Sequence, residues 1–100
     1  MAIVIKWSDE AKNTFDKNIS YLLEEWTEKE IKNFVKQTNF ILLRIVAHPE
    51  LYPASEKNPK IRKAAINKYI VLYYSYHSTK KEVMLLTFWH NKQDPKKLKY

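Results

Sequence analysis

The chain has 100 residues and a mass of 12.1 kDa, the size of one domain with a single hydrophobic core. It is 45% hydrophobic and 29% charged, as globular proteins are, and it contains neither cysteine nor glycine. Disulfide scaffolds, thiol nucleophiles and glycine-rich phosphate loops are therefore excluded. No apolar run approaches the roughly 20 residues that span a bilayer, and the first residues do not form a long apolar signal segment. We expect one cytoplasmic domain over residues 1–100 that does not enter a membrane.

The positive charge is concentrated in the second half of the chain. The whole protein carries +7. Residues 1–50 hold seven bases and eight acids, a net −1, whereas residues 51–100 hold eleven bases and three acids, a net +8. A surplus confined to one half favours a polyanionic partner, either nucleic acid or an acidic protein segment. The alternative is a surface that lysines keep soluble.

Residues 3–26 predict a strand followed by an amphipathic helix. The apolar run Ile3-Val4-Ile5 continues into Lys6-Trp7, and Ser8 is a suitable N-cap because its hydroxyl can accept a free backbone N–H. Apolar residues then recur at spacings of three and four, as on one face of a helix. They are Ala11, Phe15, Ile19, Leu22, Leu23 and Trp26.

A second helix is predicted to begin almost where the first ends. Thr27-Glu28-Lys29-Glu30 is a capping box, and Pro49 ends the helix at His48. Its apolar stripe is Ile31, Phe34, Val35, Thr38, Ile41, Leu42 and Ile45. Phe40, Leu43 and Val46 widen that stripe, so we expect this helix to be more buried than the first. The short connection makes the two helices an antiparallel hairpin.

The second half of the chain predicts three strands. Residues 49–59 contain three of the four prolines and form a loop. The hydrophobic period then changes to two, which is typical of strands, over residues 60–66, 69–76 and 82–89. Asp94-Pro95 begins a final helical turn through Leu98. The order β-α-α-β-β-β predicts an α+β fold in which the helical hairpin packs on one face of a mainly antiparallel four-stranded sheet.

The strand pairing predicts which side chains the helices leave uncovered. If Asn67-Lys68 is a two-residue turn, residue 64 lies opposite 71 and residue 62 opposite 73. The predicted core face then holds Ile61, Lys63, Ala65, Ile70, Leu72 and Tyr74. The free face holds Lys60, Arg62, Ala64, Ile66, Tyr69, Val71 and Tyr73. On that face Arg62 can bind a phosphate and Tyr73 can stack on a base. The alternative is that the tyrosines only cover a half-exposed sheet.

Bases and tyrosines of the second half are the candidate residues for binding a target or a nucleic acid. They are Lys57, Lys60, Arg62, Lys63, Tyr69, Tyr73 and Lys92. The alternative for the lysine cluster is an edge strand that charge protects against pairing with other sheets.

The histidines do not predict a metal site. His48, His77 and His90 show no metal-ligand spacing, so we expect no metal and no cofactor. His90 stands where an apolar strand passes into a basic segment, and an ordinary pKa near 6.5 suits proton transfer on an RNA 2′-hydroxyl. The alternative is an unreactive residue at a strand end.

Four motifs in this order resemble the RelE/ParE superfamily of bacterial type II toxins. The motifs are Ile5-Lys6-Trp7-Ser8-Asp9-Glu10-Ala11, His48-Pro49-Glu50-Leu51-Tyr52, Ile61-Arg62 followed by Tyr69-Ile70-Val71-Leu72-Tyr73-Tyr74, and Leu85-Leu86-Thr87-Phe88-Trp89-His90 with Gln93-Asp94-Pro95. The resemblance spans roughly residues 3–98. It implies the toxin component of a type II toxin–antitoxin, or plasmid stabilisation, system, neutralised by a cognate acidic antitoxin. A toxin–antitoxin hetero-oligomer or a homodimer is the assembly to expect.

The resemblance also implies a choice between two targets. RelE-like members cleave messenger RNA on the ribosome, whereas ParE-like members have no nuclease activity and poison DNA gyrase. Phe88-Trp89-His90 stand where ribonuclease members tend to carry arginine. The ParE-like branch is therefore favoured, with growth inhibited by binding to a macromolecular target such as DNA gyrase.

Two alternatives stay open. The first is a RelE-like ribosome-dependent mRNA endoribonuclease, in which the catalytic residues are His90, Arg62 and Lys60, with Arg62 holding the scissile phosphate. The second is a non-catalytic nucleic-acid-binding module that uses the tyrosine and lysine face.

Overall fold

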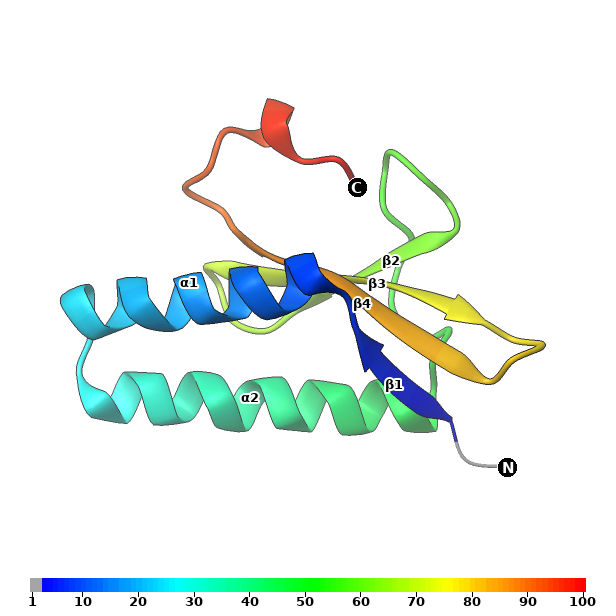
Figure 1. Ribbon diagram of the computed structural model, residues 1–100, viewed down its shortest axis with the longest axis horizontal. Coiled ribbons are helices and arrows are strands. Elements are labelled where there is room, and N and C mark those ends of the chain that lie inside the picture. Colours follow the sequence, from blue (N-terminus) through cyan, green and yellow to red (C-terminus); the bar gives the residue numbers. More distant parts are fainter. Residues whose placement is uncertain (1–2) are drawn as a thin grey trace.

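The computed structural model describes residues 3–100 and has the predicted β-α-α-β-β-β order. Its elements are β1 (Val4–Trp7), α1 (Asp9–Glu25), α2 (Glu28–Ala47), β2 (Ile61–Ala65), β3 (Ile70–His77), β4 (Glu82–His90) and a short 3-10 helix, η1 (Pro95–Lys97). The strands form one sheet in the order β1-β4-β3-β2, in which β1 is parallel to β4 and the other pairs are antiparallel. The predicted α+β fold, a helical hairpin against a mainly antiparallel four-stranded sheet, is confirmed (Figure 1).

Side-chain caps define the two helices where the sequence predicted them. The Ser8 hydroxyl accepts the N–H of Ala11 at 3.0 Å and starts α1. Thr27 and Glu30 form both bonds of the capping box that starts α2. Pro49 follows the C-cap of α2, residue His48. Across residues 3–100, no helix is both long and apolar enough to cross a membrane.

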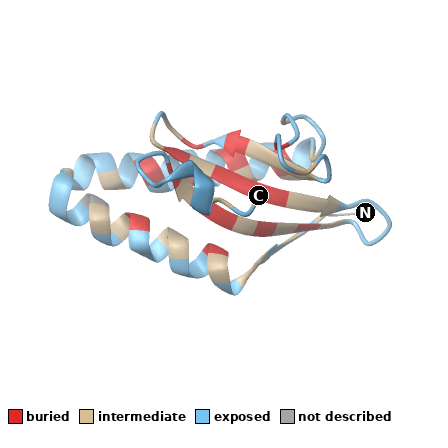
Figure 2. Cartoon of the chain, turned by 90° about the horizontal axis from the view of Figure 1, so that it is seen from above, coloured by how far each residue is buried: buried red, intermediate tan, exposed pale blue. Residues whose placement is uncertain are grey.

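The second helix, α2, has more buried residues than α1, as predicted, but the predicted widening of its buried face is wrong at two positions. Its buried face is Phe34, Thr38, Ile41 and Ile45. Phe40 and Leu43 instead point away from the sheet and are 54% and 70% exposed. The reason is that α2 has packing partners on one side only, so the wider part of its apolar arc faces solvent. Much of the ribbon of both helices has the colour of exposed residues in Figure 2. On α1 the predicted stripe residue Leu23 is also exposed, and the side chain of Leu22 lies outside the described part of the chain.

The predicted register of the β2–β3 hairpin is wrong by one residue. Ala64 pairs with Leu72, and Ile66 donates its N–H to the carbonyl of Ile70 at 2.9 Å, so the loop contains three residues rather than two. Asn67 explains the extra residue, because its Oδ1 accepts the N–H groups of Tyr69 and Ile70 at 2.8 and 2.9 Å. This side-chain turn closes the loop without the positive φ angles that a two-residue hairpin requires.

The shifted register separates the predicted free face into two parts. β3 keeps its predicted orientation, with Ile70, Leu72 and Tyr74 buried towards the helices. The side chains of β2 exchange faces, because a shift of one residue moves every side chain to the other side of a strand. Arg62, which pairs with Tyr74, therefore lies on the helix side, and Lys63 lies beside Tyr73 on the other.

The C-terminal segment, residues 91–100, covers part of the sheet face that points away from the two helices (Figure 1). The rings of Tyr73 and Tyr100 stack with centroids 6.4 Å apart. Lys57 donates to the carbonyl of Leu98, and Lys99 forms an ion pair with Glu10 at 3.6 Å. The prediction that this face is open is therefore wrong at Tyr73, which is only 8% exposed.

Candidate functional site

The candidate residues predicted from sequence divide into three separate groups. Each group lies against a different part of the fold, so the residues do not form one site. They are His90, Lys92 and Tyr69 near α1, Lys57, Lys63 and Tyr73 near the C-terminal segment, and Lys60 with Arg62 at the start of β2.

Arg62 holds a loop against the sheet. Its Nη1 donates to the carbonyl of Tyr52 at 2.6 Å, and the Tyr74 hydroxyl donates to the carbonyl of Pro49 at 2.8 Å in the same loop. Burial raises the pKa of Tyr74 to about 12, so this hydroxyl remains a donor at neutral pH. Lys60, the neighbouring candidate, is exposed. These contacts give Arg62 a structural role in anchoring residues 49–59.

The backbones of His90 and Arg62 lie far apart on the sheet. His90 pairs with Ile70 and Arg62 pairs with Tyr74, four residues apart along β3 and on opposite sides of that strand. Ideal strand spacings then place their backbones roughly 16 Å apart. The pair predicted for an endoribonuclease is therefore not brought together.

The second group surrounds a cavity of about 390 Å³ beneath the C-terminal segment. Lys57, Lys63, Tyr73, Trp89 and Tyr100 are among its lining residues. Burial, with a smaller contribution from Glu56, raises the pKa of Tyr73. Because the Tyr100 ring already stacks on the Tyr73 ring, a nucleic-acid base could stack on Tyr73 only if the C-terminal segment moved away.

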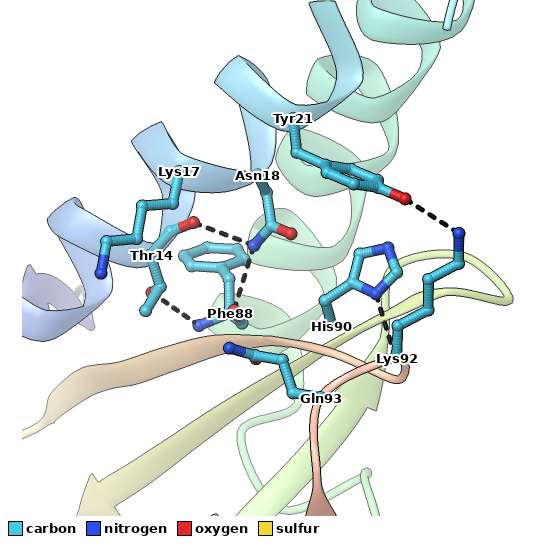
Figure 3. Close-up of a pocket in the computed structure, with 8 residues that line it drawn as sticks. All are labelled: Thr14, Lys17, Asn18, Tyr21, Phe88, His90, Lys92 and Gln93. Atoms are coloured by element: carbon cyan, nitrogen blue, oxygen red, sulfur yellow. Dashed lines mark hydrogen bonds between the residues drawn. The ribbon is translucent and has the colours of Figure 1, made fainter. Parts of the chain in front are cut away.

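His90 and Lys92 of the first group line a pocket of about 260 Å³ between α1 and the end of β4 (Figure 3). Its lining residues are Thr14, Lys17, Asn18, Tyr21, Phe88, His90, Lys92 and Gln93. Thr14, Lys17, Asn18 and Tyr21 come from α1. Phe88 and His90 come from β4, and Lys92 and Gln93 follow that strand.

The pocket exists because β4 continues beyond β1. The parallel pairing ends at Trp7 and Leu85, so the edge of β4 that follows has no neighbouring strand. Side chains of α1 replace that strand at Phe88. Thr14 Oγ1 accepts the Phe88 N–H at 2.9 Å, and Asn18 Nδ2 donates to the Phe88 carbonyl at 3.1 Å. These bonds hold α1 on the strand edge.

His90 is the most buried ionisable side chain of the pocket, at 9% exposure. Its Nδ1 accepts the N–H of Lys92 at 3.1 Å, so the neutral ring carries its proton on Nε2. Its ring lies between those of Tyr21 and Tyr69, with centroids 5.2 and 6.2 Å away. Burial, and then the charge of Lys92, lowers the pKa of His90.

Lys92 contacts the Tyr21 ring at its hydroxyl end. Its Nζ donates to the Tyr21 hydroxyl at 2.8 Å, and this bond raises the pKa of Lys92. The side chain therefore remains a cation at the rim of the pocket.

Acidification is expected to destabilise the protein partly through His90. Burial lowers the folded-state pKa below the value near 6.5 expected in the unfolded chain, so the unfolded state binds more protons below that pH. The free energy of unfolding then decreases as the pH falls below about 6.5. This decrease ends once the pH is below the folded-state pKa of His90. Melting temperatures at pH 7 and pH 5 should show a smaller drop for His90→Gln than for the parent, with the exposed His77→Gln as control. Equal drops for His90→Gln and the parent would contradict this assignment.

The sequence did not identify the α1 half of the pocket. Thr14, Lys17, Asn18 and Tyr21 recur at spacings of three and four, so they share one face of α1. That spacing was the available signal, but polar residues on a helix usually face solvent. Only the tertiary structure shows that this face meets β4.

Comparisons with known proteins agree with this fold. A family model described as "ParE toxin of type II toxin-antitoxin system, parDE" matches residues 5–95. The chain is also similar to a solved structure titled "Chromosomal ParDE TA system from P. aeruginosa", with a TM-score of 0.71 and 15% identity, covering 89% of this chain and 96% of that chain. None of the curated proteins matches. Since the family model spans most of the sequence, the chain belongs to the ParE toxin family of type II toxin–antitoxin systems.

Proposed function

We propose that this protein is a toxin that inhibits growth by binding a macromolecular target such as DNA gyrase, and that a cognate acidic antitoxin neutralises it. Family membership supports the toxin assignment. The similar P. aeruginosa structure is named for a ParDE toxin–antitoxin system, which supports the antitoxin partner. The surplus of positive charge in residues 51–100 favours an acidic one.

The exposed strip of α2 is the observation that carries a protein-binding function. The strip consists of Lys36, Phe40, Leu43 and Arg44, which recur at helical spacing on the side away from the buried face. The Arg44 guanidinium lies over the Phe40 ring, 5.7 Å from its centroid. Exposed apolar side chains flanked by cations fit an amphipathic segment that carries acidic residues. We therefore place the antitoxin contact on this strip.

The distance between His90 and Arg62 argues against the endoribonuclease alternative. Both side chains are also engaged in the fold, Arg62 with the Tyr52 carbonyl and His90 with the Lys92 N–H. Catalysis by this pair would require both side chains to leave these hydrogen bonds and turn towards one another.

Induction of the gene without a neighbouring antitoxin gene tests the proposal. We expect growth arrest with DNA damage and uncut messenger RNA, and rescue by co-expression of an acidic antitoxin. Transcript mapping decides between the branches, because in-frame cuts that disappear in His90→Ala or Arg62→Ala would establish the endoribonuclease. Unimpaired growth would favour a nucleic-acid-binding module without toxicity.

Leu43→Glu is expected to weaken antitoxin binding about tenfold or more. The substitution removes an apolar contact and places a carboxylate opposite an acidic segment. Because Leu43 is exposed, the free energy of unfolding should change by no more than about 0.5 kcal/mol. Titration calorimetry with the purified antitoxin measures the loss.

Leu23→Glu is the matched control, since it makes the same change at an exposed leucine on α1. Equal affinities of Leu43→Glu and the parent would place the antitoxin elsewhere.

A further inference from the structure

We propose that the pocket between α1 and β4 binds a small aromatic anion of the mononucleotide class. The inference goes beyond the proposed function, since it concerns the isolated chain and requires neither an antitoxin nor a growth target. It rests on the charge, the free polar groups, the apolar floor and the size of the pocket.

The charge of the pocket favours an anion. Its lining includes two lysines, Lys17 and Lys92, and no carboxylate. Within residues 3–100, Lys17 forms no ion pair. A second pocket of about 180 Å³ shares Tyr21, His90 and Lys92 with the first, and Glu25 is the one carboxylate of its lining. The two amines lie on opposite sides of the pocket (Figure 3). Because Lys92 Nζ already donates to the Tyr21 hydroxyl, the anionic group of the ligand belongs at the Lys17 end.

The free polar groups of the pocket favour a heteroaromatic ring rather than a bare anion. Asn18 Nδ2 is used by the carbonyls of Thr14 and Phe88, which leaves the Asn18 Oδ1 as an acceptor. The Nε2–H of His90 is a donor, because Nδ1 accepts the Lys92 N–H. Gln93 adds both a donor and an acceptor in its exposed side-chain amide. A phosphate offers only its P–OH groups as donors, whereas a nucleobase presents donors and acceptors together on one planar edge.

The apolar floor and the size of the pocket fit one ring system. Phe88 is buried beneath the pocket, and the Tyr21 ring forms a wall on which a base can stack. The volume of about 260 Å³ lies slightly below the range of roughly 300–1,000 Å³ for small-molecule sites. The adjoining pocket adds further room at the His90 end. Together the two pockets offer room for one nucleotide, and a longer strand would extend beyond them.

Calorimetric titration of the full chain with AMP, adenosine and inorganic phosphate tests the proposal. We expect AMP to bind at least tenfold more tightly than either of the others, because only AMP combines the ring with the charge. Lys17→Met should reduce AMP affinity about tenfold and leave adenosine unchanged. Lys12→Met, which removes an exposed lysine of α1 outside the pocket lining, is the matched control and should bind AMP like the parent.

A second variant keeps the test decisive if a change on α1 disturbs folding. Gln93 lies after β4 and is exposed, so Gln93→Ala should keep the parent melting temperature and lose about fivefold in AMP affinity. NMR chemical-shift changes on AMP addition should centre on Asn18, Tyr21 and His90. A tetranucleotide with a 5′-phosphate separates the two sources of this ligand chemistry: weaker binding than AMP indicates a free nucleotide, and equal binding indicates a strand end.

Three results would overturn the proposal. They are no AMP binding at millimolar concentration, equal binding of AMP and inorganic phosphate, and equal losses in Lys17→Met and Lys12→Met. Growth inhibition is not measured in any of these experiments, so a failure here leaves the proposed toxin function intact.

Discussion

Phe34→Ala is expected to lower the free energy of unfolding by about 3–5 kcal/mol. Phe34 lies on the buried face of α2 and is 1% exposed. Its ring stacks on Phe15 with centroids 5.4 Å apart, and Phe15 in turn contacts Trp7 and Phe88 at 5.4 and 5.1 Å. The truncation opens a cavity where α1, α2 and the sheet meet. For a 100-residue domain this corresponds to a decrease in melting temperature on the order of 15 °C. Urea denaturation measures the change in free energy, and thermal scanning measures the change in melting temperature.

Phe40→Ala is the matched control, because it makes the same change on the same helix at an exposed position. Its free energy of unfolding should stay within about 0.5 kcal/mol of the parent. Similar losses in both variants would mean that Phe40 is part of the core, as the widened apolar stripe predicts, and would remove the exposed strip on which the proposed antitoxin contact depends.

The contrast between Phe34 and Phe40 shows what helical periodicity can and cannot predict. The period of the apolar residues, the Thr27 capping box and Pro49 were sufficient for the position and limits of α2. They could not separate core residues from exposed ones, because an apolar strip that binds a partner and one that packs on a sheet have the same composition. Burial depends on what covers the helix, and that is a tertiary property.

The predicted binding surface was harder to place than the fold, because it depends on one residue of register between β2 and β3. The alternation of apolar and polar residues is compatible with both registers of the β2–β3 hairpin. The Asn67 side chain determines which register forms, because it closes a three-residue loop. That single difference moved Arg62 to the helix side and removed the predicted surface of Arg62 and Tyr73. The cover over Tyr73 likewise depends on contacts between residues far apart in sequence, such as that of Lys99 with Glu10.

Thr14→Val combined with Asn18→Leu is expected to lower the free energy of unfolding by about 2–4 kcal/mol. Each substitution keeps roughly the volume of the side chain and removes one bond to Phe88, whose N–H and carbonyl are left without partners near the core. An unpaired buried group costs about 1–3 kcal/mol. The double variant should lose less stability than the sum of the losses in the two single variants. The reason is that α1 leaves the strand edge and admits water once either bond is absent.

Amide hydrogen exchange at Phe88 distinguishes loss of this edge from a general loss of packing. In Thr14→Val the Phe88 N–H should exchange much faster than its neighbours on β4, because its acceptor is gone. Thr14→Ser retains the hydroxyl and removes only a methyl group, so Phe88 should remain protected. If Thr14→Val protected Phe88 as well as Thr14→Ser does, the α1 side chains would not be replacing a strand at this edge. The pocket beside His90 would then lack the wall that these bonds provide, which makes the exchange rate of one amide a test of the pocket as well as of the fold.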